Sequence, residues 1–188
     1  MFFQKTALLA FLASSLVAAV PAPIEVKLPA TPEGLVIIDQ RYVGKDILVT
    51  YGDVDLHGAD GQKLKGRSLP PMSELEKRQC GSNDLFCSRS YIPNDICVRQ
   101  LQSDINLTYR DTIPEAPRSI CRTSSNNGFC CVSWAHPARG AVRNNLLAAM
   151  SKTYYGCVKN GQSGLTRNTN LGGTCTTQCL SSNANTCR

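Results

Sequence analysis

The chain has 188 residues, ten cysteines and a formal net charge of +6. After the first twenty residues it has no second long apolar run, which excludes a membrane-spanning protein. A small basic protein favours anionic partners such as acidic wall polymers, membrane headgroups or RNA, but basicity alone selects none of them.

Residues 1–19 are typical of a secretory signal peptide. Lys5 precedes an apolar run that starts at Ala7, and Val17-Ala18-Ala19 fits a cleavage site. The run is too short for a comfortable membrane span. We therefore expect a secreted, extracellular product.

Residues 20–78 contain no cysteine, and we expect them to be a pro-segment. The stretches 35–42 and 46–51 are rich in β-branched and aromatic residues, and 43–45 between them could form a loop. This pattern predicts a β-hairpin. The sequence does not decide whether the hairpin assists folding, delays activity or has no role after cleavage.

The pro-segment ends in a flexible linker with a processing site. Residues 58–78 have few apolar side chains and two adjacent prolines, and they end in the dibasic pair Lys77-Arg78. The pair stands directly before the part of the chain in which the cysteines are dense. We expect a furin-type processing protease to cut after Arg78.

The mature segment, residues 79–188, then contains eleven Lys or Arg against five Asp or Glu. It also contains every cysteine: Cys80, Cys87, Cys97, Cys121, Cys130, Cys131, Cys157, Cys175, Cys179 and Cys187. This density is typical of a secreted disulfide scaffold. We expect five disulfides, whose connectivity cannot be derived from the sequence.

The cysteine spacing argues against a metal or redox site. A zinc site uses reduced thiolates at spacings such as two C-x-x-C pairs, and a thioredoxin-like site also needs C-x-x-C. This chain has an adjacent pair and a C-x3-C instead, in a protein expected to reach an oxidising compartment. We expect neither metal nor cofactor.

The adjacent cysteines lie in the stretch "GFCCVSWA", residues 128–135. Neighbouring Cα atoms are about 3.8 Å apart, whereas ordinary disulfides need roughly 4.4–6.8 Å, so Cys130 and Cys131 are poor partners for each other. In a strand their side chains point to opposite faces, and both faces here are largely apolar. We expect a strand that is anchored on each side, with Trp134 in the core.

Two helices and two further strands are predicted around this strand. Residues 93–106 repeat apolar side chains at spacing four, and 141–161 carry a longer apolar stripe. Residues 118–123 and 174–181 are the other strand candidates. We expect a small disulfide-stapled α+β domain with two helices on a mainly antiparallel sheet of three or four strands.

Candidate catalytic residues are few. The mature segment has one histidine, His136, and one glutamate, Glu115. With Arg139 and Tyr154 they could supply the base, acid and cation of a ribonuclease, but nothing in the sequence indicates that they are close together. Ser133 lacks a G-x-S-x-G turn, and strand alternation points it into a buried face. A non-catalytic protein is the favoured interpretation.

Asn106-Leu107-Thr108 is a glycosylation sequon at the expected end of the first helix. The placement predicts an exposed asparagine. We therefore expect Asn106 to carry a glycan in a secreted chain.

Three stretches and the last cysteine of the chain together resemble a family of fungal secreted proteins called WD-like domain proteins, which are unrelated to WD40 propellers. They are "PEAPRSIC" (114–121), "GFCCVSWA" (128–135), "LTRNTNLGGTCTTQCLSS" (165–182) and the closing Cys187. The resemblance covers nearly all of 79–188 and implies a secreted fungal protein without an assigned reaction. More loosely, size, basicity and cysteine content are similar to those of fungal killer toxins and host-directed effectors, some of which share small α/β sandwich folds.

Three functions remain open. The favoured one is a non-catalytic, toxin-like or host-interaction protein that acts outside the cell. The alternatives are a secreted ribonuclease-like hydrolase and a passive cell-wall polysaccharide-binding module. For the favoured function the partner is an unidentified extracellular target, with an anionic surface or a cell-wall component as candidates, and no nucleic-acid partner is expected.

Overall fold

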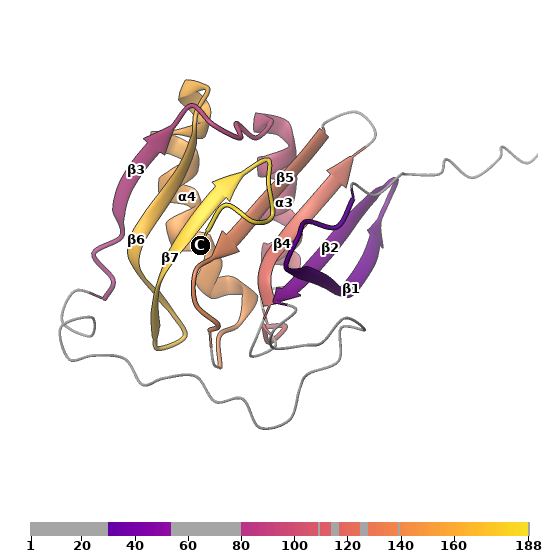
Figure 1. Cartoon of the computed structure of the whole chain (residues 1–188), viewed down its shortest axis with the longest axis horizontal. Helices are drawn as coiled ribbons and strands as arrows, with labels where there is room; N and C mark the ends of the chain where they lie inside the picture. The colour runs from indigo at the N-terminus through magenta and orange to yellow at the C-terminus, as the bar shows by residue number, and fades with distance from the viewer. Residues whose placement is uncertain are drawn as a thin grey trace, which may run out of the picture.

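The computed structural model describes residues 30–53, 80–108, 110–113, 117–124, 128–138 and 140–187. Their strands form one antiparallel sheet in the order β1-β2-β4-β5-β7-β6-β3 (Figure 1). The strands are β1 (Leu35–Val43), β2 (Asp46–Asp53), β3 (Asp84–Ser88), β4 (Pro117–Ser124), β5 (Gly128–Trp134), β6 (Ser163–Leu171) and β7 (Thr174–Ser181). The helices are α3 (Asp95–Leu107) and α4 (Leu147–Gly156), with the 3₁₀ turns η1 (Arg143–Leu146) and η2 (Val158–Asn160).

The expected α+β domain with a three- or four-stranded sheet is wrong. The described residues form a mostly β fold with seven antiparallel strands in one sheet and two α-helices. The expectation placed the hairpin β1–β2 outside the domain, although β2 pairs with β4 in the same sheet. It also missed β3 and β6, which are short or polar and lack a clear alternation of apolar residues.

Side chains that bond to the backbone determine where the helical segments begin. The Asn94 side chain accepts hydrogen bonds from the backbone N–H groups of Ile96 and Cys97, which caps the first turn of α3. The expected continuous helix over 141–161 is divided into η1, α4 and η2. At the start of this segment the Asn145 side chain accepts a hydrogen bond from the Val142 N–H at 2.8 Å, a local bond that competes with regular helix.

Neither helix in the described part of the chain is long and apolar enough to cross a membrane.

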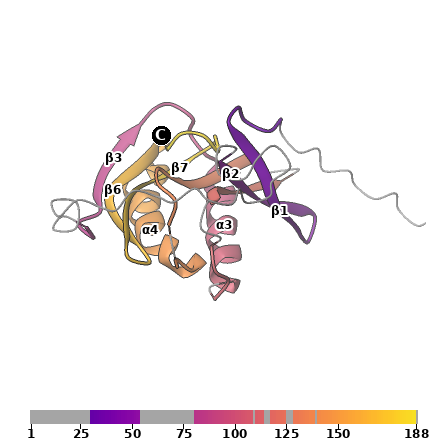
Figure 2. The same ribbon diagram turned by 60° about the horizontal axis from the view of Figure 1, so that its bottom comes forward.

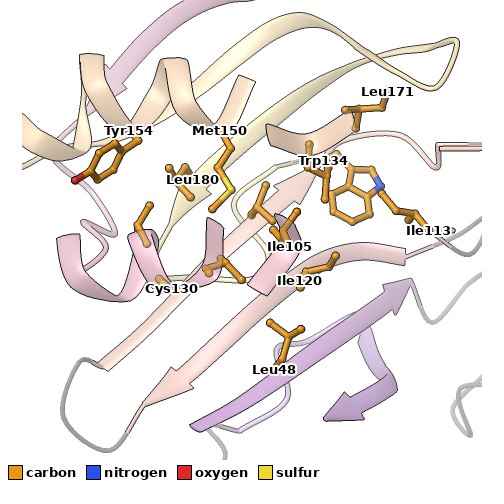
Figure 3. Packing of buried hydrophobic residues seen from close by; sticks show 14 of the residues in the cluster. Leu48, Ile105, Ile113, Ile120, Cys130, Trp134, Met150, Tyr154, Leu171 and Leu180 are labelled. Atoms are coloured by element: carbon orange, nitrogen blue, oxygen red, sulfur yellow. The ribbon is translucent and has the colours of Figure 1, made fainter. Parts of the chain in front are cut away.

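One face of the sheet packs against both helices and forms the main core (Figure 3). Trp134 of β5 and Leu180 of β7 meet Ile105 of α3 and Met150 of α4 there, all fully buried. Full burial of such side chains stabilises a fold by about 1.5–3 kcal/mol each. This core therefore fixes how the helices lie on the sheet.

The other face carries a second, smaller core. Tyr51 of β2 and the Cys121–Cys131 disulfide lie in it, and Ala184 of the C-terminal segment, residues 182–187, covers them. Figure 2 shows α3 and α4 beneath the sheet and the C-terminus on the opposite side. The sheet is thus covered on both faces near its centre, by helices on one side and by irregular chain on the other.

The adjacent cysteines form disulfides on opposite faces of the sheet: one joins β5 to a helix, and the other joins β5 to the neighbouring strand. Cys130 bonds to Cys97 of α3 on the helix face, and Cys131 bonds to Cys121 of β4 on the other face. The two side chains leave β5 in opposite directions, as strand alternation predicts. Two further disulfides, Cys87–Cys157 and Cys179–Cys187, tie β3 to the end of α4 and the C-terminal segment to β7.

The hairpin of β6 and β7 turns at Gly172 and Gly173. Both residues have positive φ angles, 60° and 93°, which a two-residue hairpin turn requires and which glycine adopts without steric cost. A Cβ atom on Gly172 would also lie 2.6 Å from the Cα of Ala141. The turn therefore needs glycine for its backbone and for the approach of the neighbouring chain.

Candidate functional site

A cavity of about 500 Å³ opens where β3, β6 and β7 meet the C-terminal segment. Cys179 and Ser181 of β7 line it, and they lie on the same face of the sheet as Cys131, which is opposite the helices. This volume lies within the usual range for a small-molecule site. We call this cavity the strand-edge pocket.

Small polar residues make up much of the wall of the strand-edge pocket. Ser163 at the start of β6 donates to the backbone oxygens of Ser88, at 3.3 Å, and of Ser90, at 2.6 Å. Ser181 of β7 donates to the Asn183 backbone oxygen at 2.8 Å and lies 2.8 Å from the Thr186 hydroxyl. These bonds fix the hydroxyl groups and the backbone on both sides of the cavity.

The C-terminal segment is held over the pocket by a disulfide, and a hydrogen bond within the segment fixes its shape. The Cys179–Cys187 disulfide closes a short loop, so the residues between them stay close to β7. The Asn185 backbone N–H donates to the Asn183 side chain at 2.9 Å, and both residues line the pocket. The wall that this segment provides is therefore preformed rather than dependent on a ligand.

Two aromatic side chains stand at the pocket. Phe86 of the edge strand β3 is 48% exposed, and Tyr91, in the loop after β3, is 57% exposed. The Arg167 guanidinium lies over the Phe86 ring, 4.6 Å from its centroid, a cation–π contact that orients the ring. Aromatic rings that remain exposed in this way are available to a ligand.

Tyr91 has a strained backbone. Its φ angle is 51°, in the left-handed region that bulky residues rarely adopt. The Tyr91 backbone oxygen accepts from the Ser182 N–H at 2.8 Å, which ties this loop to the C-terminal segment. Backbone strain of this kind is concentrated at functional sites, where the surrounding structure maintains it.

Among the described residues, no Asp, Glu, Lys, Arg or His lines the strand-edge pocket. Its polar groups are hydroxyls, side-chain amides and backbone groups. Such a lining favours a neutral ligand that is rich in hydrogen-bonding groups, since these lining side chains offer a charged ligand no ion pair in return for its lost hydration. The cationic side chains that give the chain its positive net charge are therefore not among the described residues that line this pocket.

The predicted catalytic residues do not form a site in the described part of the chain. His136 is exposed in the loop after β5, and its backbone N–H donates to the Thr176 hydroxyl at 3.0 Å. Tyr154 is buried on the helix side of the sheet. Glu115 and Arg139 lie outside the described residues. Ser133 is buried, as strand alternation predicts.

The remaining predicted residues are distributed as follows. Asn106 is exposed in the last turn of α3, whereas Lys77 and Arg78 lie outside the described residues. The four disulfides join eight of the ten cysteines. Cys80 is a partly buried free thiol before β3, and Cys175 is buried in β7.

Sequence reasoning missed the strand-edge pocket completely. Its walls come from β3, β6, β7 and the C-terminal segment, and two of these strands were not predicted. The serines and asparagines in it are common loop residues with no motif of their own. Only the C-x3-C and closing-cysteine pattern indicated that the C-terminal segment would be fixed to the fold.

Comparison with known proteins gives one match. The sequence model of the fungal WD-like family matches residues 63–187, well over half of the chain. No curated protein and no solved structure matches the chain. The match includes β3 to β7, both helices and the strand-edge pocket, and it begins after the hairpin β1–β2. The chain therefore belongs to the fungal WD-like family.

Proposed function

We propose that this protein is a secreted, non-catalytic binding protein that holds a neutral cell-wall polysaccharide in the strand-edge pocket. The observation that carries the proposal is the lining of the pocket. In the part of the chain that the structure describes, this lining combines hydroxyl and amide groups with exposed Phe86 and Tyr91 and has no charged side chain. Sugars present many hydroxyl groups and apolar ring faces, and such a wall complements both.

The lining of the pocket also supports binding without cleavage. Glycoside hydrolysis usually needs two carboxyl groups on either side of the bond, and none of the described carboxylates lines the strand-edge pocket. Among the functions left open by the sequence, the wall-binding module is therefore the one that this geometry favours. A toxin-like or host-directed role is compatible with it, since wall binding would be the means of attachment to a target.

The test is binding of the secreted full chain to insoluble chitin and β-glucan at about 1 M salt, where the Debye length is only about 3 Å. We expect retention at high salt, and titration with soluble oligomers should give a measurable dissociation constant. Tyr91→Ala and Phe86→Ala should each raise this dissociation constant roughly tenfold, as truncation of an aromatic contact does in other binding sites.

The control variant is Tyr155→Ala. Tyr155 is 65% exposed on α4, on the helix side of the sheet, and does not line the pocket. The Tyr155→Ala variant should bind the polysaccharides as tightly as the unchanged protein does. Loss of binding at high salt would show simple charge attraction and overturn the proposal, as would equal binding by all three variants. Release of soluble sugar from either polymer would overturn its non-catalytic part.

A further inference from the structure

We propose that the hairpin β1–β2 stays bound in the sheet as a separate chain when the protein is cut between Asp53 and Cys80. The mature protein would then be a two-chain assembly rather than the segment 79–188 alone. The proposal concerns any cut in this interval, of which the predicted site after Arg78 is one. Three features of the hairpin lead to it.

The first feature is the ladder between β2 and β4. Six residue pairs join these strands, from Ile47 opposite Thr123 to Gly52 opposite Pro117. Without the hairpin, β4 would become an edge of the sheet with its backbone groups unpaired. Natural proteins protect such edges because an exposed apolar edge strand pairs with other chains.

The second feature is the burial of β2 on both of its faces. Ile47, Val49 and Tyr51 lie in the second core, against the Cys121–Cys131 disulfide. Leu48 points to the opposite face and belongs to the main core on the helix side of the sheet (Figure 3). Loss of the hairpin would open both cores at once. The hairpin is thus an internal part of the fold rather than a cover on its surface.

The third feature is a set of polar contacts from the hairpin to the rest of the protein. Arg122 of β4 is buried and pairs with Asp46 at the start of β2. Arg118, at the other end of β4, pairs with Asp53 at 2.8 Å. The Asn185 side chain of the C-terminal segment donates to the Glu33 backbone oxygen at 3.0 Å.

These contacts make departure unfavourable after the covalent link is cut. A released hairpin would leave the buried Arg122 without one of its two carboxylate partners. The interaction has the form of strand addition, in which main-chain bonds give affinity and alternate side chains fill pockets. The occupant of this edge is therefore the protein's own residues 35–53.

The experiment uses the full chain with the recognition sequence of a site-specific protease placed within residues 58–66. The purified protein is cut, and the products are separated by size exclusion under native conditions and identified by mass spectrometry. We expect both fragments in one peak at the size of the uncut protein, and their separation only in denaturant. Elution of the C-terminal fragment without the hairpin would overturn the proposal.

Variants of the hairpin give a second readout. Asp46→Asn removes one charged partner of Arg122 and should raise the dissociation constant of the cut hairpin about tenfold. Val49→Asp places a charge in the second core and should release the hairpin on cutting. Lys45→Gln, in the exposed turn, is the matched control and should leave retention unchanged. Equal retention by all three would overturn the proposal.

Discussion

Arg122 of β4 donates a hydrogen bond to Asp46 of β2, and both side chains are almost entirely enclosed by the protein. The second terminal nitrogen of the guanidinium donates to Asp104 of α3. One arginine therefore connects the hairpin, the centre of the sheet and a helix. The two carboxylates and the single guanidinium leave this buried cluster with one excess negative charge when all three are ionised.

Arg122→Gln should lower the free energy of unfolding by about 3–5 kcal/mol, because two buried carboxylates would lose their cationic partner. The control is Arg41→Gln. Arg41 pairs with Asp39 and Asp111 where the side chains are 40–45% exposed, and such surface pairs contribute at most about 1 kcal/mol. Urea unfolding of the two variants measures the difference, and equal losses would contradict the central role of Arg122.

Stability should also depend on pH through Asp104. Burial raises the pKa of the Asp104 carboxyl above its ordinary value of 3.8, and the Arg122 guanidinium offsets only part of the rise. The folded protein therefore binds this proton at a pH at which the unfolded chain has released it. The contribution of this group to the free energy of unfolding must then increase as pH falls from the raised pKa toward 3.8.

The measurement is the difference in free energy of unfolding between the unchanged protein and Asp104→Asn over this pH range. Asparagine resembles the protonated carboxyl but does not titrate, so other groups cancel in the difference. We expect the unchanged protein to gain relative to the variant on acidification. A difference that is independent of pH would show that Asp104 keeps an ordinary pKa, and a difference that moves the other way would show a lowered one; either result would contradict the prediction.

The Cys179–Cys187 disulfide should matter for ligand binding as well as for stability. It joins cysteines that are eight positions apart in the sequence and so contributes about 2–3 kcal/mol by the chain-entropy estimate. It also holds Asn183, Asn185 and Thr186 at the strand-edge pocket. Replacing both cysteines by alanine should lower polysaccharide affinity at least tenfold at a temperature where the protein remains folded.

The matched control replaces Cys121 and Cys131, which are ten positions apart in the sequence and do not line the pocket. The two double variants should lose similar stability, as measured by thermal unfolding, but only the first should lose affinity. Equal affinities would mean that the C-terminal segment does not form a wall of the ligand site.

The central part of the fold could be predicted from local sequence pattern. Residues 128–135 carry apolar side chains on both faces of a strand, as a strand that is covered on both sides requires. In the structure β5 occupies Gly128–Trp134. The strands over 118–123 and 174–181 and the helix over 93–106 likewise have the periodicity of their elements. In each case aliphatic side chains or cysteines recur among the buried positions and carry the pattern, although polar side chains such as Arg122 and Gln178 are buried beside them.

The outer strands could not be predicted in this way. The buried positions of β6 include Gly164, Thr166 and Thr169, and its register with β7 shifts between the two threonines, where Asn168 has a φ angle of 55°. Such a strand shows neither apolar alternation nor constant period. β3 is a five-residue edge strand that only its pairing with β6 defines. The pairing of β2 with β4 is equally invisible locally, because some seventy residues separate the partners.

Glycosylation of Asn106 tests the predicted secretory route. The side chain is exposed in the last turn of α3, so an attached glycan would extend into solvent. Thr108, the third sequon residue, donates its hydroxyl to the Asp104 backbone oxygen at 2.8 Å, so its replacement would also disturb the helix end. Asn106→Gln is therefore the clean variant. The secreted protein should lose mass on enzymatic deglycosylation, and Asn106→Gln should have the deglycosylated mass and unchanged stability. An unchanged mass after deglycosylation of the parent protein would show that the sequon is not used.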